Sequence, residues 1–304
     1  MADYTPEGSG ASARELDEEQ LRQAFEEGRI LESVALAFDC RKQLVFQLAG
    51  RPALMPYEEC ADGVAEGAVR EVALLTRVGR PTCFYITALP RPGQGYQLSR
   101  RLAQQKCKAE YLDALCPGDL LPCRVTHLEG FGAFCDVGCG VSALLPIDCM
   151  SVSRIRSPAD RVRVGQTLTC AVKSRDAQGR LVLTLRELMG TWQQNAGLFQ
   201  AGETVVGLVR SIESYGVFIE LAPNLAGLAE RTEGLRVGQP VSVFIKSILP
   251  DKMKIKLVIV NRQLTEPVYF APRYFITEGR LDRWVYSTPG SKKQVETDFT
   301  AAAL

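Results

Sequence analysis

Residues 211–221, SIESYGVFIEL, combine an alternating strand with an aromatic residue on its polar side. Side chains alternate between the two faces of a strand, so the aliphatic residues from Val217 to Leu221 share one face. Phe218 falls on the other face, beside the carboxylate of Glu220. A ring in that position needs an explanation beyond simple core packing.

The same arrangement occurs 84 positions earlier, in residues 127–137, HLEGFGAFCDV. There Phe134 shares a face with Asp136. Residues 118–137 align with residues 202–221 without a gap, and both begin with Gly and end in an aromatic-Gly-x-Phe strand. The chain therefore contains an internal repeat, and the two rings indicate a repeated use.

A second pair of segments extends each copy of the repeat. Residues 163–185 match residues 236–259 at an offset of 73, so the connecting loop is 11 residues longer in the first copy. Each copy holds about five short alternating strands with turn signals between them and no long helix. This pattern predicts a small, closed, all-β barrel.

The order of motifs resembles the RNA-binding domain of ribosomal protein S1. In the later copy GLVRSI (207–212) leads to the aromatic-Gly-x-Phe element, a Gly-Leu segment (227–235), VGQ and a Lys-bearing strand. The resemblance implies an all-β-dominated fold of tandem five-stranded OB-type barrels joined by short helices. It places these S1-type domains at residues 117–188 and 201–260.

Residues 28–97 read as a degenerate third copy. GRILESVALAFDCRKQLVFQLAG gives two alternating strands, and VGRPTCFYITAL gives a late strand, but the aromatic-Gly-x-Phe element is missing. The segment resembles the degenerate first domain of short, clostridial-type S1 proteins. We therefore expect a scaffold role and no RNA contact from this copy.

Four segments lie outside the repeats. Residues 1–27 form an acidic tail and an amphipathic helix, and the tail MADYTPEGSGASA is expected to lack fixed structure. Residues 98–116 and 189–200 are predicted helical linkers. Residues 261–304 form an aromatic-rich C-terminal extension that we expect to wrap the third barrel.

Composition limits the class of protein. The chain of 304 residues has a formal charge of +1, but residues 1–30 carry a net charge of −5, which leaves +6 for the remainder. No long apolar run or secretory signal is present, so a cytoplasmic location with no membrane association is expected. Ten Cys without a CxxC pair and a single His argue against zinc, and no metal or cofactor is expected.

The aromatic residues supply a physical mode of RNA binding. Unpaired bases expose flat faces, and stacking on an exposed ring tolerates any base. The resemblance implies that Phe131 and Phe134, and likewise Tyr215 and Phe218, face RNA. The alternative is that one ring of each pair caps the barrel core.

Cations beside the rings would neutralise phosphates. Asp176 and Arg180 lie four residues apart around a turn and match the acidic and basic pair of the family. In the later copy Lys254 occupies the position equivalent to Arg180, and Lys246 lies nearby. Ordinary solubility is the alternative role for these charges. The predicted RNA-binding residues are Phe131, Phe134, Asp176, Arg180, Tyr215, Phe218, Lys246 and Lys254.

Two features depart from a simple match to the family. Pro146 and Glu230 replace the histidine that the family often has in its Gly-Leu segment, so that contact is absent or changed. A basic run, RRLAQQKCK (100–108), either extends the RNA path between barrels or forms a solvated helix face.

The sequence favours a non-catalytic, monomeric protein that binds single-stranded mRNA and acts in translation, with the small ribosomal subunit as a further partner. His127 and Cys123 lie two pleats apart on a strand, too far for a nucleophile and its base, and there is no phosphate-binding loop. The alternatives are an OB-fold protein-interaction module, or a regulator of RNA processing without stable ribosome association.

Overall fold

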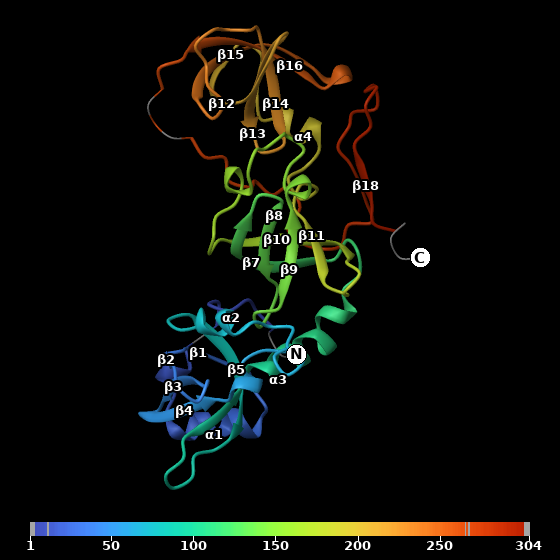
Figure 1. The fold of residues 1–304 in the computed structure, drawn as a ribbon. Coiled ribbons are helices and arrows are strands. Elements are labelled where there is room, and N and C mark those ends of the chain that lie inside the picture. Colours follow the sequence, from blue (N-terminus) through green and yellow to red (C-terminus); the bar gives the residue numbers. More distant parts are fainter. Residues whose placement is uncertain (1–3, 11, 265, 267, 301–304) are drawn as a thin grey trace. The chain divides into compact units, whose positions relative to one another are not determined.

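The chain folds into two compact units, each built mainly from antiparallel strands (Figure 1). The computed structural model describes residues 4–10, 12–264, 266 and 268–300. The first unit comprises Met1–Leu115, Pro122–Arg124 and Asp136–Ser142. The second comprises Cys116–Leu121, Val125–Cys135 and Ala143–Leu304.

The first unit contains a six-stranded sheet in the order β1-β5-β6-β4-β3-β2. The two edge strands, β1 and β2, are consecutive in the chain and separated only by residues 35–36. The sheet therefore has five strand positions, and the first strand is divided into β1 and β2. Its strands are β1 (Leu31–Val34), β2 (Ala37–Phe38), β3 (Leu44–Leu48), β4 (Arg51–Met55), β5 (Pro81–Ala88) and β6 (Tyr96–Ser99).

The helices of this unit begin at capping residues that the sequence supplies. Asp17 and Gln20 form a capping box at the start of α1, and Ser99 caps α3. Leu21 on α1 is fully buried in the core of the sheet. The helices are α1 (Glu18–Glu26), α2 (Glu71–Leu75) and α3 (Arg100–Glu110), with short 3-10 turns η1 (Ala13–Glu15), η2 (Tyr57–Glu59) and η3 (Leu112–Ala114).

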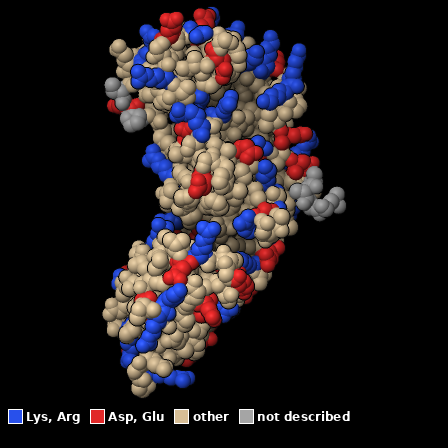
Figure 2. Space-filling model, viewed as in Figure 1, with Lys and Arg blue, Asp and Glu red and all other residues tan. Residues whose placement is uncertain are grey.

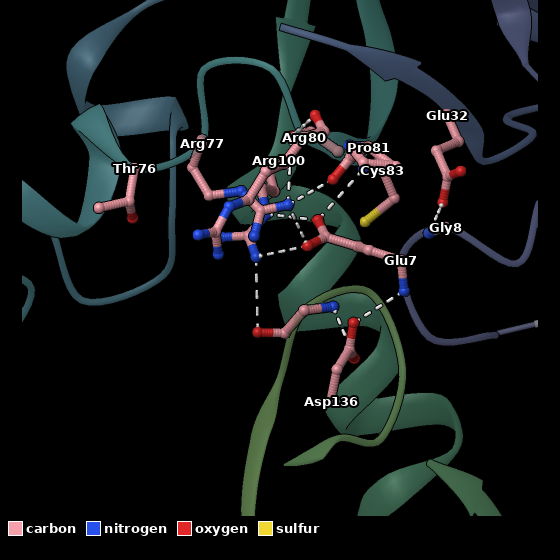
Figure 3. A network of polar contacts seen from close by, with 12 residues as sticks. Glu7, Gly8, Glu32, Thr76, Arg77, Arg80, Pro81, Cys83, Arg100 and Asp136 are labelled. Carbon is pink, nitrogen blue, oxygen red and sulfur yellow. Dashed lines mark hydrogen bonds and ion pairs between the residues drawn. The ribbon is translucent and has the colours of Figure 1, made fainter. Parts of the chain in front are cut away.

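The N-terminal segment is ordered, so the prediction that it lacks fixed structure is wrong for residues 4–10. Tyr4 and Glu7 are both buried. Glu7 accepts hydrogen bonds from Arg100 Nε at 2.7 Å and from the Cys83 backbone N–H at 3.2 Å (Figure 3). The sequence does not predict this order, because nothing within an acidic, Gly-rich tail indicates that Glu7 will pair with a buried arginine.

The Glu7 network holds opposite and like charges close together. Burial acts to raise the pKa of Glu7, but the charges of Arg100 and Arg77 outweigh it and the pKa lies below its usual value. The backbone N–H of Glu7 donates to Asp136 at 2.7 Å. Burial and then the charge of Glu7 raise the pKa of the Asp136 carboxyl to about 6.

Two closed barrels follow, with the same five-membered strand order as the first sheet. In each, the third and fifth strands pair in parallel. The pairs β10·β11 and β12·β13 are antiparallel. The second barrel comprises β7 (Leu120–Glu129), β8 (Gly132–Asp136), β9 (Ser142–Pro146), β10 (Thr167–Arg175) and β11 (Leu181–Thr184). The third comprises β12 (Thr204–Glu213), β13 (Gly216–Ala222), β14 (Leu225–Ala229), β15 (Pro240–Leu249) and β16 (Lys254–Asn261).

The predicted fold class, tandem five-stranded barrels joined by short helices, is confirmed. The domain limits set from the repeats stay predictions. Short elements connect and extend the barrels: α4 (Trp192–Ala196), the 3-10 turns η4 (Ile147–Cys149), η5 (Pro158–Asp160) and η6 (Pro250–Lys252), and the hairpin of β17 (Arg283–Val285) and β18 (Glu296–Asp298).

A buried ion-pair network joins the second and third barrels within the second unit. Glu220 on β13 is fully buried and accepts from Arg161 at 2.5 Å and from Arg210 Nε at 2.7 Å. Arg210 also lies 3.1 Å from Asp160. Because a buried charge is costly unless it is paired, these contacts are mutually dependent.

The C-terminal segment packs on both barrels of the second unit, which corrects the expectation that it wraps the third barrel alone. Trp284 and Tyr286 lie in the core cluster of the third barrel. Other residues of the segment form a cluster with the second barrel. That cluster contains Leu120, Ala171, Leu188, Tyr274, Ile276, Leu281 and Phe299.

Candidate nucleic-acid interface

Each closed barrel presents a pair of aromatic rings at the tip of its first hairpin. Phe131 is 57% exposed and meets Phe134 edge to face, with ring centroids 6.1 Å apart at 88°. Tyr215 is 68% exposed and meets Phe218 at 6.2 Å and 89°. The second and third barrels therefore repeat one ring geometry, with one ring of each pair open to solvent.

The glycine between the two aromatic residues is required by close backbone approach. A Cβ on Gly132 would lie 2.6 Å from the carbonyl oxygen of Leu145. A Cβ on Gly216 would lie 2.6 Å from the carbonyl oxygen of Ala229. Any larger residue would push the hairpin away from the next strand and displace the rings.

The carboxylates beside the rings are buried, so the premise that they mark a solvated face is wrong. Asp136 is buried and accepts hydrogen bonds from the backbone N–H groups of Gly138 and Gly140 at 2.9 and 3.0 Å. Glu220 is held in its arginine network. Phe134 and Phe218 are accordingly half-buried, and the more exposed ring of each pair is the one before the glycine.

His127 extends the ring pair of the second barrel into a set of three. Its imidazole stacks on Phe134 with centroids 6.5 Å apart at 24°, and its Nε2 lies 2.8 Å from Glu129. The sequence reading considered His127 only as a catalytic base. Its place in the hairpin, equivalent to Ser211 opposite Phe218, could have revealed this contact.

A lysine of the third barrel lies on the same face as Phe218. Phe218 is in register with Leu228 on β14, and Leu228 is in register with Lys256 on β16. Residues in register across neighbouring strands point to the same face, so exposed Lys256 lies on the face of Phe218, two strands away, with β14 between them. The sequence placed Lys256 only in a lysine cluster near Lys254 and did not predict its position on the face of Phe218, because a parallel pairing between distant strands leaves no local pattern.

The second barrel has a different residue at the same place. Val182 is in register with Leu144 on β9 and with Ser174 on β10, as Lys256 is with Leu228 and Ser247. The two barrels thus share their rings but differ in the charge beside them. Figure 2 shows Lys and Arg side chains spread over the third barrel with a few acidic ones between them.

Asp176 and Arg180 form the ion pair that the turn predicted. Arg180 Nε donates to Asp176 at 2.7 Å, and the Arg180 side chain is 63% exposed. Slight desolvation acts to raise the pKa of Asp176, but the hydrogen bonds from Arg180 outweigh it and the pKa lies below its usual value. The exposed guanidinium is oriented by its neighbour and still open to an anion.

The third barrel keeps the cations without that acidic partner. Lys254 is in register with Leu249, which stands where Asp176 stands in the second barrel. The added residue, Met253, adopts a left-handed conformation at φ 47° to complete the turn. Lys246 and Lys254 are both exposed.

The basic run on α3 is engaged within the first unit. Arg100 is buried against Glu7, Arg101 pairs with Glu59 at 2.5 Å, and the Lys108 ammonium lies 2.5 Å from Asp62. Lys106 lies over a tyrosine ring. These partners account for the four cations, so neither an RNA path nor a simple solvated face describes this helix.

Two further properties follow from the described residues alone. Across residues 4–10, 12–264, 266 and 268–300, no group of three or more His, Cys, Asp or Glu side chains is arranged to hold a metal ion. In that same part of the chain, no helix has the length and apolar character needed to cross a membrane.

Two closed barrels that each display a pair of aromatic rings are typical of proteins that bind nucleic acid through OB-type barrels. The particular family follows from comparison: residues 116–186 match the S1 RNA binding domain. This match confirms the predicted resemblance to the S1 RNA-binding domain for that stretch of the chain. The chain is a nucleic-acid-binding protein related to ribosomal protein S1.

Curated relatives support this assignment. The chain is 31% identical to the small ribosomal subunit protein bS1 of Staphylococcus saprophyticus over 50% of this chain and 42% of the relative. It is 33% identical to that of Staphylococcus haemolyticus over 53% and 45%. It is 28% identical to the bS1 homolog of Bacillus subtilis over 74% and 60%. The chain thus covers between 42% and 60% of these relatives.

A comparison with solved structures also gives an alignment over most of the chain. The aligned structure is a multidomain protein with nucleic acid binding domains from Streptococcus pneumoniae, 15% identical over 78% of this chain and 74% of the other. The TM-score is 0.26, too low to carry an argument.

Proposed function

We propose that the protein binds single-stranded RNA, in particular mRNA, through the ring pairs of its second and third barrels. The observation that supports this most is the repeated edge-to-face pair with Phe131 and Tyr215 open to solvent. Exposed rings stack on bases of any identity, and each stack contributes about 1 to 3 kcal/mol. Such binding is tolerant of sequence, as reading a varied mRNA requires.

The protein acts by binding alone, as a cytoplasmic monomer, in translation and next to the small ribosomal subunit. The names of its curated relatives, small ribosomal subunit proteins bS1, support this role. The first sheet serves as a scaffold, because the turn between β2 and β3 carries Asp39, Cys40 and Arg41 where the barrels carry rings. Titration of the full chain with a fluorescent 12-nucleotide uridine RNA tests the proposal, and a lack of saturable binding would refute it.

Salt dependence separates the charged contacts from the stacked ones. We expect Lys256→Gln to reduce the log-log slope of RNA affinity against salt by about 0.7, because one phosphate contact of a single strand is lost. The measurement is the same RNA titration at four salt concentrations. Lys292→Gln, an exposed lysine outside the barrels, is the matched control and should leave the slope unchanged. Equal slopes for both variants would remove Lys256 from the interface.

A further inference from the structure

The outer face formed by β12, β15 and β16 of the third barrel is apolar and open to solvent. Val206, Val258 and Val260 are 44%, 47% and 61% exposed. Half-buried Phe244 is in register with Val258 and with Thr204. We call these five residues the valine face. Apolar groups gathered on a strand face mark a binding surface more often than scattered ones do.

The equivalent face of the second barrel is covered. The pair Ala171 and Thr184 has the same register as Phe244 and Val258, yet both of its members are fully buried. The cover is the C-terminal segment, which brings its bulky side chains against this face. Those side chains are Tyr274, Ile276, Leu281 and Phe299, in one cluster with Ala171 and Leu120.

The backbone of the second barrel also binds this segment. The Leu281 N–H donates to the Gly118 carbonyl at 2.9 Å, and Asp119 forms an antiparallel bridge with Arg280. A Cβ on Gly118 would lie 1.9 Å from the Leu281 carbonyl oxygen. The second barrel thus accepts an extended segment both at its glycine and along its apolar face.

The third barrel repeats the acceptor glycine, and there the described residues leave it open. Gly202 is the equivalent glycine and has nearly the same backbone, with φ of +96° against +91° for Gly118. The two glycines also make the same backbone hydrogen bond. The Gly202 N–H donates to the Ile245 carbonyl, as the Gly118 N–H donates to the Val172 carbonyl. A Cβ on Gly202 would meet nothing within 4 Å among the described atoms.

We propose that the valine face, together with Gly202, binds an extended polypeptide segment of a partner protein. The segment carries aliphatic and aromatic side chains spaced like those of residues 274–281, and it pairs with the barrel by backbone hydrogen bonds.

RNA is the less suitable occupant of this face. Bases need open ring surfaces for stacking, and the exposed side chains among these five residues are three valines and Thr204, while the ring of Phe244 is half-buried. A polypeptide already fills the equivalent face of the second barrel. The inference is independent of RNA binding by the ring pairs, which lie on the first hairpin of each barrel.

The test uses the full chain and a fluorescent synthetic peptide with the sequence of residues 272–282, PRYFITEGRLD. We expect saturable binding by anisotropy, and none for a peptide with the same residues in shuffled order. Val258→Lys and Val206→Lys should each weaken peptide binding at least about tenfold, because each places an ammonium group on the apolar face. Val72→Lys is the control, since Val72 is also exposed, by 61%, but lies on α2 of the first unit.

The outcomes divide cleanly. Both face variants lie at exposed positions and a thermal melt will verify that they fold, so a loss of peptide binding with unchanged melting supports the proposal. The proposal would be overturned if the peptide does not bind, or if the shuffled peptide binds equally well. It would also be overturned if both face variants bind the peptide as tightly as the unchanged chain does. Loss of affinity for uridine RNA in Val258→Lys with peptide binding intact would also overturn it, and would assign the face to the RNA path instead.

Discussion

Glu220→Gln should destabilise the second unit by about 3 to 5 kcal/mol, the largest stability effect that we expect from a single substitution. Glu220 is fully buried and pairs with Arg161 and Arg210, whose side chains are 0% and 3% exposed. A neutral amide leaves two buried guanidinium groups without a full counter-charge. Because Arg161 belongs to the second barrel and Glu220 to the third, both barrels lose a shared support.

The measurement is a thermal melt of the full chain followed by circular dichroism. A loss of this size lowers the melting temperature of a unit of this length by roughly 6 to 20 °C. Glu230→Gln removes the same charge from an exposed position on the same barrel and should shift the melting temperature little. Equal shifts for the two variants would show that the network contributes no net stability.

The second large effect concerns RNA affinity. Phe131→Ala and Tyr215→Ala should each weaken binding to uridine RNA by about 1 to 3 kcal/mol, which is roughly 5- to 150-fold. Both rings are more than half exposed, so truncation removes little core packing and the melting temperature should change little. Affinity and stability are therefore expected to separate at these two positions.

Titration and a thermal melt of each variant give the two readings. Phe25→Ala is the matched control, because Phe25 is 36% exposed on α1 of the first unit, away from the hairpins of the barrels. Its RNA affinity should equal that of the unchanged chain. A drop in melting temperature with unchanged affinity for Phe131→Ala and Tyr215→Ala would mean that the rings are packing elements.

The predictions from sequence succeeded where the information is local. The two members of each ring pair lie three residues apart around one hairpin, so the spacing and the repeat together were enough to find them. Asp176 and Arg180 were found in the same way, because both lie in a single turn. Along β13, in contrast, the period-two pattern does not predict the observed burial, because only Phe218 is half-buried and Glu220 is buried like its neighbours.

The predictions failed where distant segments meet. Lys256 comes beside the rings only through parallel pairing with β14, and nothing near residue 256 reveals that pairing. The burial of Glu220 depends on Arg161, 59 residues earlier. Similarly, Glu7 is ordered by Arg100, for which the sequence left open an RNA path or a solvated helix face. Glu220 and Glu7 were taken as signs of a solvated surface, whereas each has a buried arginine partner far away in the chain.

The central claim is that RNA lies on the ring pairs of the second and third barrels. Its most direct test is photo-crosslinking of the full chain to uridine RNA that contains 4-thiouridine, followed by mass spectrometry of the linked peptides. The account predicts crosslinks in the peptides that hold residues 131–134 and 215–218. Crosslinks confined to other parts of the chain, with both hairpins unmodified at saturating RNA, would contradict it.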